Sequence, residues 1–228
     1  MTPYKTLCSS HAVIACGSLR HEFESLMKDD TGPDIHYLDT DLHRTPVRIP
    51  EVLQAKIDEI SSSYKTIVLG YGLCSNGVVG VSARGATLIV PRVHDCLDLF
   101  LGFVGKGKSR IGLGTAHYYL TPGTILNKKD PLAIMELEYI PKMGQKKSEW
   151  GMKEELKHYT HFALITSPRK DMDVVRDQAQ KNAEFFDMTL TEVKSDLNFF
   201  KQTLYGPHDP EHFLHISPGE AISQEMFM

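Results

Sequence analysis

The chain has 228 residues, of which 41% are hydrophobic and 24% are charged, a balance typical of an ordinary soluble globular protein. Its formal net charge of −4 leaves no broad positive surface to hold a phosphate backbone, so nucleic acid is not expected as a partner. The apolar stretch at 12–15 near the amino end is too short for a signal-peptide core or a membrane span. We therefore expect one domain over 1–228, located in the cytoplasm and not in a membrane.

The first half of the chain alternates apolar runs with helical stripes, which predicts repeated βα units. Ser18 is expected to cap the first helix, and Pro50 is expected to open the second. The third run shows no polar alternation, as expected of a parallel strand that is covered on both faces, and the fourth run is also expected to be a buried strand. The strands predicted in this half cover 11–17, 34–38, 65–72 and 86–93.

The second half returns to the same alternation after a glycine-rich stretch at 104–122, which is expected to end in a turn at Pro122 and Gly123. With right-handed crossovers, the order of elements predicts an α/β fold: a mostly parallel sheet flanked by helices in three layers. The remaining predicted strands cover 118–121, 161–167, 189–193 and a last segment within 212–219, and the predicted helices cover 131–138, 149–157 and 171–187.

Three of the four cysteines follow predicted strands at their carboxyl ends: Cys16 the first strand, Cys74 the third and Cys96 the fourth. In an open α/β sheet, ligands bind beyond this edge, where loops from different strands converge. We therefore expect the three thiols to meet there. The alternative for each is packing as a small hydrophobic residue, and Cys8, before the first strand, is expected to be incidental.

Thiolates are soft ligands that select zinc, copper(I) or iron–sulfur clusters. Three protein ligands leave one position open, where zinc can activate water or a substrate thiol. An iron–sulfur cluster held by three cysteines would instead leave one iron for the substrate. The sequence has no C-x-x-C spacing to decide between them, and we favour zinc.

Polar residues beside the cysteines are candidates for moving a proton. His94 precedes Asp95 and Cys96, and it is a candidate general acid–base or fourth ligand. Asp95 is a candidate to orient that histidine, with an N-cap of the next helix as the alternative. His43, in the loop after the second strand, is placed at the same predicted edge.

Other residues near the predicted edge are candidates for binding a small-molecule substrate. Arg92 can hold a carboxylate or phosphate through its bidentate fork, although a salt bridge is the commoner use of arginine. Gly72 and Asn76 lie on the loop that carries Cys74. This loop is reminiscent of a nucleophile elbow, but its second glycine is one position late for G-x-C-x-G. A nucleophilic Cys74 activated by His94 is an open alternative to metal binding.

Several stretches also carry a resemblance to a known family. They are Ile14–Gly17, Leu42-His43 with Pro46, Val68–Gly77, Pro91–Cys96 and Tyr119–Gly123. On these stretches the sequence resembles the bacterial and archaeal family known as the domain of unknown function 1638, over about Ala12 to Gly219. Members tend to be encoded near corrinoid-dependent methyltransferase systems. The resemblance implies a part in one-carbon or methyl-group metabolism, with a corrinoid protein or a methyltransferase as partner.

The expected function is that of a metal-dependent enzyme with Cys16, Cys74 and Cys96 as ligands, in which methyl or thiol transfer occurs at the open position. One alternative is a three-cysteine iron–sulfur lyase or desulfurase. A second alternative is a non-catalytic accessory protein that binds a corrinoid protein or delivers metal.

Overall fold

The computed structural model describes residues 11–27, 32–102 and 116–228, and at 43 and 44 it describes the backbone alone. The chain divides into two compact units, which are treated separately below. The first comprises Met1–Arg110 with Asp196–Met228, and the second comprises Ile111–Ser195. The expectation of a single domain stays a prediction.

The first unit is built on a five-stranded sheet with the order β2-β1-β3-β4-β8. The first four strands are parallel, and β8 pairs with β4 in the antiparallel direction. The predicted strands of the first half are therefore confirmed, with ends trimmed by one or two residues. Their bounds are β1 His11–Cys16, β2 Asp34–Leu38, β3 Thr66–Gly70, β4 Thr87–Pro91 and β8 Phe213–Ile216.

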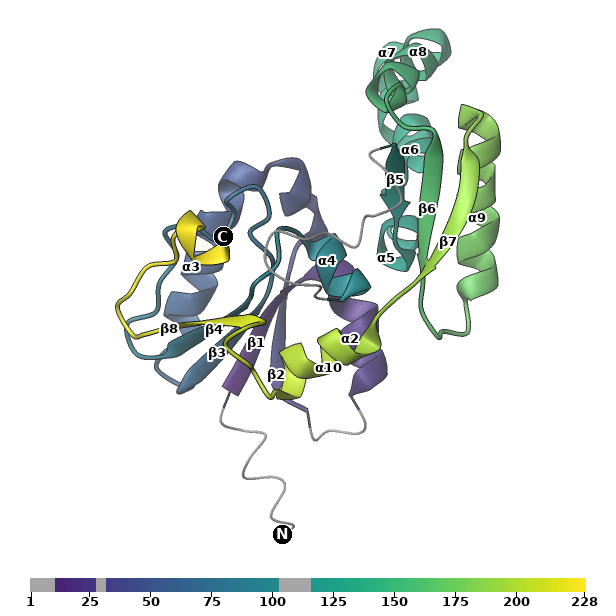
Figure 1. The fold of residues 1–228 in the computed structure, drawn as a ribbon. Helices are drawn as coiled ribbons and strands as arrows, with labels where there is room; N and C mark the ends of the chain where they lie inside the picture. Colours follow the sequence, from purple (N-terminus) through teal and green to yellow (C-terminus); the bar gives the residue numbers. More distant parts are fainter. Residues whose placement is uncertain (1–10, 28–31, 103–115) are drawn as a thin grey trace. The chain divides into compact units, whose positions relative to one another are not determined.

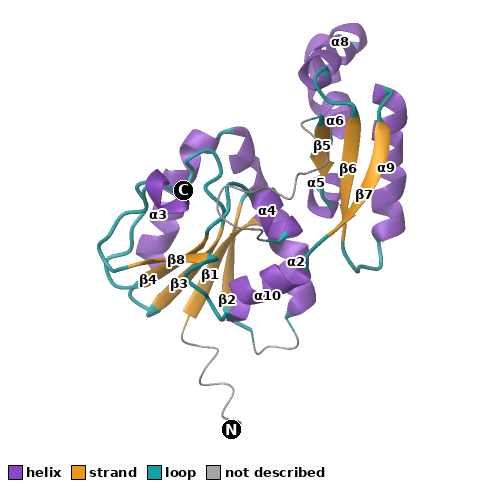
Figure 2. Cartoon of the chain, in the orientation of Figure 1, coloured by secondary structure: helices purple, strands orange, loops and turns teal. Residues whose placement is uncertain are grey.

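Helices cover both faces of this sheet, as the predicted three-layer α/β fold requires (Figure 1). The helix α3 lies on one face, and α2, α4 and α10 lie on the other (Figures 1 and 2). The bounds are α2 Arg20–Leu26, α3 Ile49–Ile60, α4 Cys96–Leu101 and α10 Leu197–Tyr205, with short 3-10 turns at Gly17–Leu19, Thr40–Arg44, Pro46–Arg48 and Gln224–Phe227.

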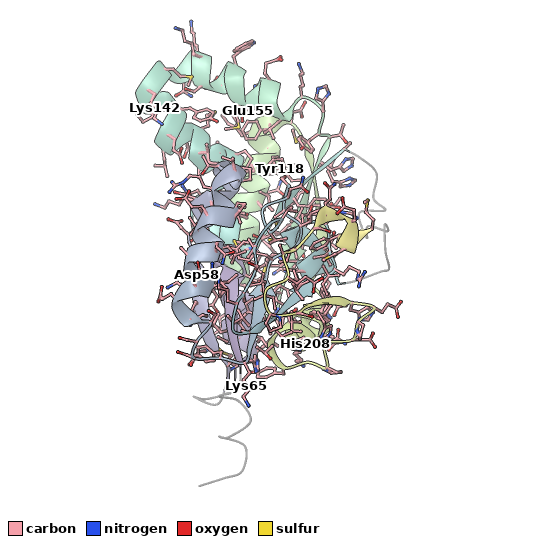
Figure 3. The ribbon with its side chains drawn as sticks, turned by 90° about the vertical axis from the view of Figure 1, so that its left-hand side faces the viewer. Asp58, Lys65, Tyr118, Lys142, Glu155 and His208 are labelled. Atoms are coloured by element: carbon pink, nitrogen blue, oxygen red, sulfur yellow. The ribbon has the colours of Figure 1, made fainter. Side chains whose placement is uncertain are left out.

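The period of apolar residues explains how α3 is oriented. Ile49, Leu53 and Ile57 fall on one stripe and are buried against the sheet. Asp58 falls on the outer side of the helix and projects away from the sheet (Figure 3). The expectation that Ser18 caps the first helix was wrong. A 3-10 turn precedes α2, and its N-cap is Cys16, whose sulfur accepts from the backbone N–H of Ser18.

The second unit has a parallel three-stranded sheet with the order β5-β6-β7. Its strands are β5 His117–Leu120, β6 His161–Thr166 and β7 Thr189–Lys194, and its helical segments are α5 Pro122–Leu126, α6 Pro131–Ile134, a π-helical turn Met135–Tyr139, α7 Ile140–Met143, α8 Gln145–Leu156 and α9 Met172–Phe186.

The expected turn at Pro122 and Gly123 was wrong, because these residues open α5. Thr121 caps that helix: its hydroxyl accepts from the backbone N–H of Thr124, and the hydroxyl of Thr124 accepts from the backbone N–H of Thr121. Proline at the first helical position suits this start, since its missing N–H would have no partner there. In either unit, no helix within the described ranges combines the length and the apolar character needed to cross a membrane.

Candidate functional site

The three strand-end cysteines lie at one edge of the five-stranded sheet, because β1, β3 and β4 are parallel and adjacent. From β1 the chain passes outward to β2 and then crosses back to β3, so the strand order reverses between β1 and β3. Ligands of open α/β sheets bind at such a switch point. Cys16, Cys74 and Cys96 are all buried there, and none of them forms a disulfide.

The thiols of Cys74 and Cys96 are in contact, with their sulfur atoms 3.3 Å apart. Two backbone hydrogen bonds align the loops that carry them: Leu73 N donates to Val93 O and Cys74 N donates to His94 O, each at 2.9 Å. The hydrogen bond to Cys74, and then burial, raise the pKa of the Cys96 thiol well above its ordinary value. Cys96 is therefore a neutral thiol near neutral pH.

Cys16 ends β1 at the same edge of the sheet as this pair. Its charge contributes to the raised pKa of Cys96 and to that of Tyr71, so its thiol lies within electrostatic range of both. Over residues 11–27, 32–102 and 116–228, no group of at least three His, Cys, Asp or Glu side chains stands in an arrangement that could hold a metal ion. The structure thus brings two of the three predicted ligands, Cys74 and Cys96, into contact. The three-cysteine metal site stays a prediction.

The loop that presents Cys74 has an uncommon backbone. Cys74, Ser75 and Asn76 have φ angles of 48°, 56° and 66°, a run of three non-glycine residues in the left-handed region. Each such residue costs about 1–2 kcal/mol in this conformation. A hydrogen bond of 3.0 Å from Gly77 N to Cys74 O closes the turn. Backbone strain of this kind concentrates at functional sites, which supports a role for the loop beyond connecting two strands.

Tyr71 belongs to the same site and was missed by the sequence reasoning. It is 1% exposed, and its hydroxyl has no hydrogen-bond partner in the described part of the chain. Burial raises the pKa of Tyr71 above its ordinary range, and the charges of the three thiols add to this effect. In the sequence, a tyrosine at the end of an apolar strand indicates packing. Its position directly after β3, at the edge where ligands of α/β sheets bind, was the one signal in the sequence that could have pointed to a functional role.

Asp98 is a second residue that sequence reasoning missed. It lies in the first turn of α4 and is buried, and burial together with the charge of Asp95 raises the pKa of its carboxyl to about 6. A carboxyl with such a pKa can exchange a proton near neutral pH.

The predicted acid–base residues take different positions around the thiols. Asp95 is the N-cap of α4, where Oδ1 accepts from Leu97 N at 2.7 Å and from Asp98 N at 3.2 Å. The capping alternative for Asp95 is therefore confirmed, and its orienting role stays a prediction. The side chain of His94 is exposed, and its backbone carbonyl accepts the hydrogen bond from Cys74 N. The side chain of His43 lies outside what the structure describes.

The predicted substrate-binding residues make structural contacts. Arg92 donates from Nη1 to Met226 O at 2.9 Å and from Nη2 to Pro210 O at 3.1 Å, which ties down the carboxyl-terminal segment. Gly72 lies against the backbone of Asp95, and the side chain of Asn76 is exposed on the Cys74 loop. Their roles toward a substrate stay predictions.

The contact between Cys74 and Cys96 makes a direct prediction. Mild oxidation of the Cys8→Ser protein with diamide should join these two thiols, because their sulfurs need to approach by only about 1.3 Å to reach the ~2.05 Å of a disulfide. Peptide mass spectrometry should find the Cys74–Cys96 cross-link, and Cys16→Ser should leave it intact. A dominant cross-link to Cys16, or no cross-link, would contradict the geometry.

Fold and site together define a three-layer α/β protein with buried thiols at the carboxyl edge of its parallel strands. The chain belongs to the family described as protein of unknown function (DUF1638), whose model matches residues 37–204. The match includes Tyr71, Cys74 and Cys96, and it begins after Cys16. Comparisons with curated proteins and with solved structures gave no match.

Proposed function

We propose that the chain binds a soft metal ion, zinc in the first place, through Cys16, Cys74 and Cys96, and uses an open coordination position to activate a thiol. The observation that supports this most directly is the contact of 3.3 Å between two buried thiols at the switch point of the sheet. Two sulfurs bound to one tetrahedral zinc at ~2.3 Å stand about 3.8 Å apart. A shift of about half an ångström therefore brings this pair to the spacing of zinc ligands.

The charge balance of the site also favours a cation. Three buried thiols that share one site cannot all ionise without a positive charge nearby, since burial and mutual repulsion disfavour the thiolates. A divalent metal supplies that charge and displaces the thiol protons as it binds. Three thiolates with one dication leave a net charge of −1, and the fourth position is left for a substrate.

The reaction to test first is methyl transfer to a small thiol in the cytoplasm, within one-carbon or corrinoid-linked metabolism. In this step the substrate sulfur attacks the methyl carbon, and the methyl donor leaves with the bonding electron pair. His94, which is exposed and lies two residues before Cys96, accepts the proton of the thiol. The methyl donor is expected to be carried by a protein partner, either a corrinoid protein or a methyltransferase.

Metal analysis of cysteine variants tests the proposal. After anaerobic purification, the wild type and the control Cys8→Ser should each contain about one zinc per chain. Cys74→Ser and Cys96→Ser should contain almost none, because serine does not replace a soft thiolate ligand, and Cys16→Ser should contain less than the wild type. Circular dichroism of each variant checks that the fold is kept.

Three outcomes would count against this function. A wild type without bound metal would leave thiol catalysis or packing as the role of the cysteines. Undiminished metal in Cys74→Ser would remove that residue from the ligand set. Iron with acid-labile sulfide and a brown colour would favour the iron–sulfur lyase or desulfurase instead.

A further inference from the structure

The sole tryptophan of the chain, Trp150, lies on the surface of the second unit. It is 69% exposed in the middle of α8, although tryptophan side chains are highly buried on average. One exposed apolar side chain needs no explanation by itself, so its surroundings decide what it means. Tryptophan is also enriched among the residues that anchor protein–protein contacts.

The period of α8 shows which residues surround Trp150. The buried side of the helix faces the core of the second unit and consists of Ser148, Met152 and Leu156. Trp150 lies on the opposite, exposed side. Residues three and four positions apart are neighbours on a helix surface. The four neighbours of Trp150 in this sense are all exposed, and three of them are lysines: Lys146, Lys147, Lys153 and Glu154.

The acidic and basic side chains near Trp150 differ in whether they have partners. The three glutamates all do: Glu149 accepts from Gln145, Glu154 pairs with Lys157 at 2.9 Å, and Glu155 accepts from Tyr139 Oη at 3.1 Å. Lys146 and Lys147 have no ion-pair or hydrogen-bond partner among the described residues, and neither has Lys142 at the turn from α7 to α8 (Figure 3). Residues 142–157 hold five lysines against three glutamates, a net charge of +2 in a chain of net charge −4.

The chemistry of this surface distinguishes between possible partners. A bilayer takes up a helix by its apolar side, and on α8 that side packs against the core of the unit. Two copies that met through the same surface would bring lysines against lysines. An acidic protein segment fits both features of the surface, because its carboxylates can pair with the lysines while an apolar side chain covers the indole ring.

We propose that the exposed side of α8, formed by Lys146, Lys147, Trp150 and Lys153 and extended by Lys142, docks an acidic protein segment in which carboxylates flank an apolar side chain. Trp150 is the central contact of this α8 surface, and the lysines around it orient the partner and speed its association. The inference goes beyond the proposed function, because no residue of the α8 surface belongs to the thiol site or to the first unit.

The test uses the full chain and three polymers as probes: a random copolymer of glutamate and leucine, poly-L-glutamate, and a random copolymer of lysine and leucine. Since Trp150 is the only tryptophan, its fluorescence reports on the α8 surface directly. The glutamate–leucine copolymer should shift the emission to shorter wavelength, because covering the ring removes water from it. Poly-L-glutamate should bind about tenfold more weakly, since it lacks the apolar contact, and the lysine–leucine copolymer should not bind. An ionic strength of about 1 M, where the Debye length is about 3 Å, should weaken binding severalfold.

Charge reversal identifies the residues that carry the binding. Lys146→Glu/Lys147→Glu should bind the glutamate–leucine copolymer at least tenfold more weakly, since like charges then meet across the interface. Trp150→Ala should lose about tenfold as well, measured by isothermal titration calorimetry because the fluorophore is gone. The matched control, Lys170→Glu/Lys181→Glu, makes the same change of charge at two exposed lysines of the second unit outside α8 and should match the wild type. Circular dichroism checks the fold of each variant.

Several results would overturn the inference. One is a wild type that does not bind the glutamate–leucine copolymer, or that binds it no better than Lys146→Glu/Lys147→Glu does. An equal loss in the control pair would mean that net charge alone explains the binding. Tighter binding to phosphatidylglycerol vesicles or to a single-stranded oligonucleotide would identify a membrane or a nucleic acid as the partner instead. Self-association in sedimentation equilibrium that the α8 reversal abolishes would identify a second copy. The zinc content of all these variants should equal that of the wild type, so the metal proposal is tested separately.

Discussion

Phe200→Ala is expected to lower the free energy of unfolding by about 3–5 kcal/mol, as truncation of fully buried aromatic residues does. Phe200 lies on α10 and is completely buried. Its ring meets Phe23 of α2 and Phe100 of α4 edge-on, with centroids 5.3 Å and 5.2 Å away. An alanine leaves a cavity where these three helices pack together on one face of the sheet. Urea unfolding followed by circular dichroism measures the loss.

The control for this substitution is on the same helix. Tyr205 is 44% exposed, and Tyr205→Ala should change the free energy of unfolding by no more than about 0.5 kcal/mol. Because α4 begins with Cys96, loosened packing around Phe100 should also lower the yield of the Cys74–Cys96 cross-link. A loss of under about 1 kcal/mol for Phe200→Ala would mean that α10 is not part of the core.

Three parallel strands of the first unit, β1, β3 and β4, were predictable because their apolar runs lack polar alternation, which is typical of strands covered on both faces. The burial of β3 from Ile67 to Gly70 is an example. Strand ends at one edge follow from the alternation of strands and helices, so the shared location of the cysteines could be inferred as well. Their place along the chain, just past three strands, contained that information.

Other features depend on long-range packing that a local pattern does not specify. The helix α10 contains the pair Phe199-Phe200, which suits a strand as well as a helix, and it was not predicted. The division into two sheets was also missed, since β5 pairs with β6 and the same alternation of strands and helices continues across the division. Tyr71 was missed because only the fold shows that its side chain is fully buried and that its hydroxyl has no acceptor in the described part of the chain.

Gly72→Ala is expected to disturb the thiol pair directly. An added Cβ would lie 2.9 Å from the N, Cα and C atoms of Asp95, and a backbone cannot rotate out of the way as a side chain can. To relieve this clash, the loops that follow β3 and β4 must separate, which costs about 1–3 kcal/mol of stability. That separation pulls on the hydrogen bond from Cys74 N to His94 O and moves the two sulfurs apart. We expect the diamide cross-link and the metal content to fall together.

Gly151→Ala is the matched comparison, because Gly151 lies within α8 and an added Cβ there meets nothing within 4 Å. Alanine is favoured over glycine inside a helix by about 1 kcal/mol, so this variant should be as stable as the wild type or more stable, with the cross-link unchanged. If Gly72→Ala kept wild-type stability and full cross-linking, the two loops would have room to spare. The close approach of Gly72 to Asp95 would then have no part in holding Cys74 against Cys96. A loss of cross-linking with little loss of stability would instead show that the added methyl group acts mainly on the thiol pair. This agrees with the contact of Gly72 with Asp95, the residue before Cys96.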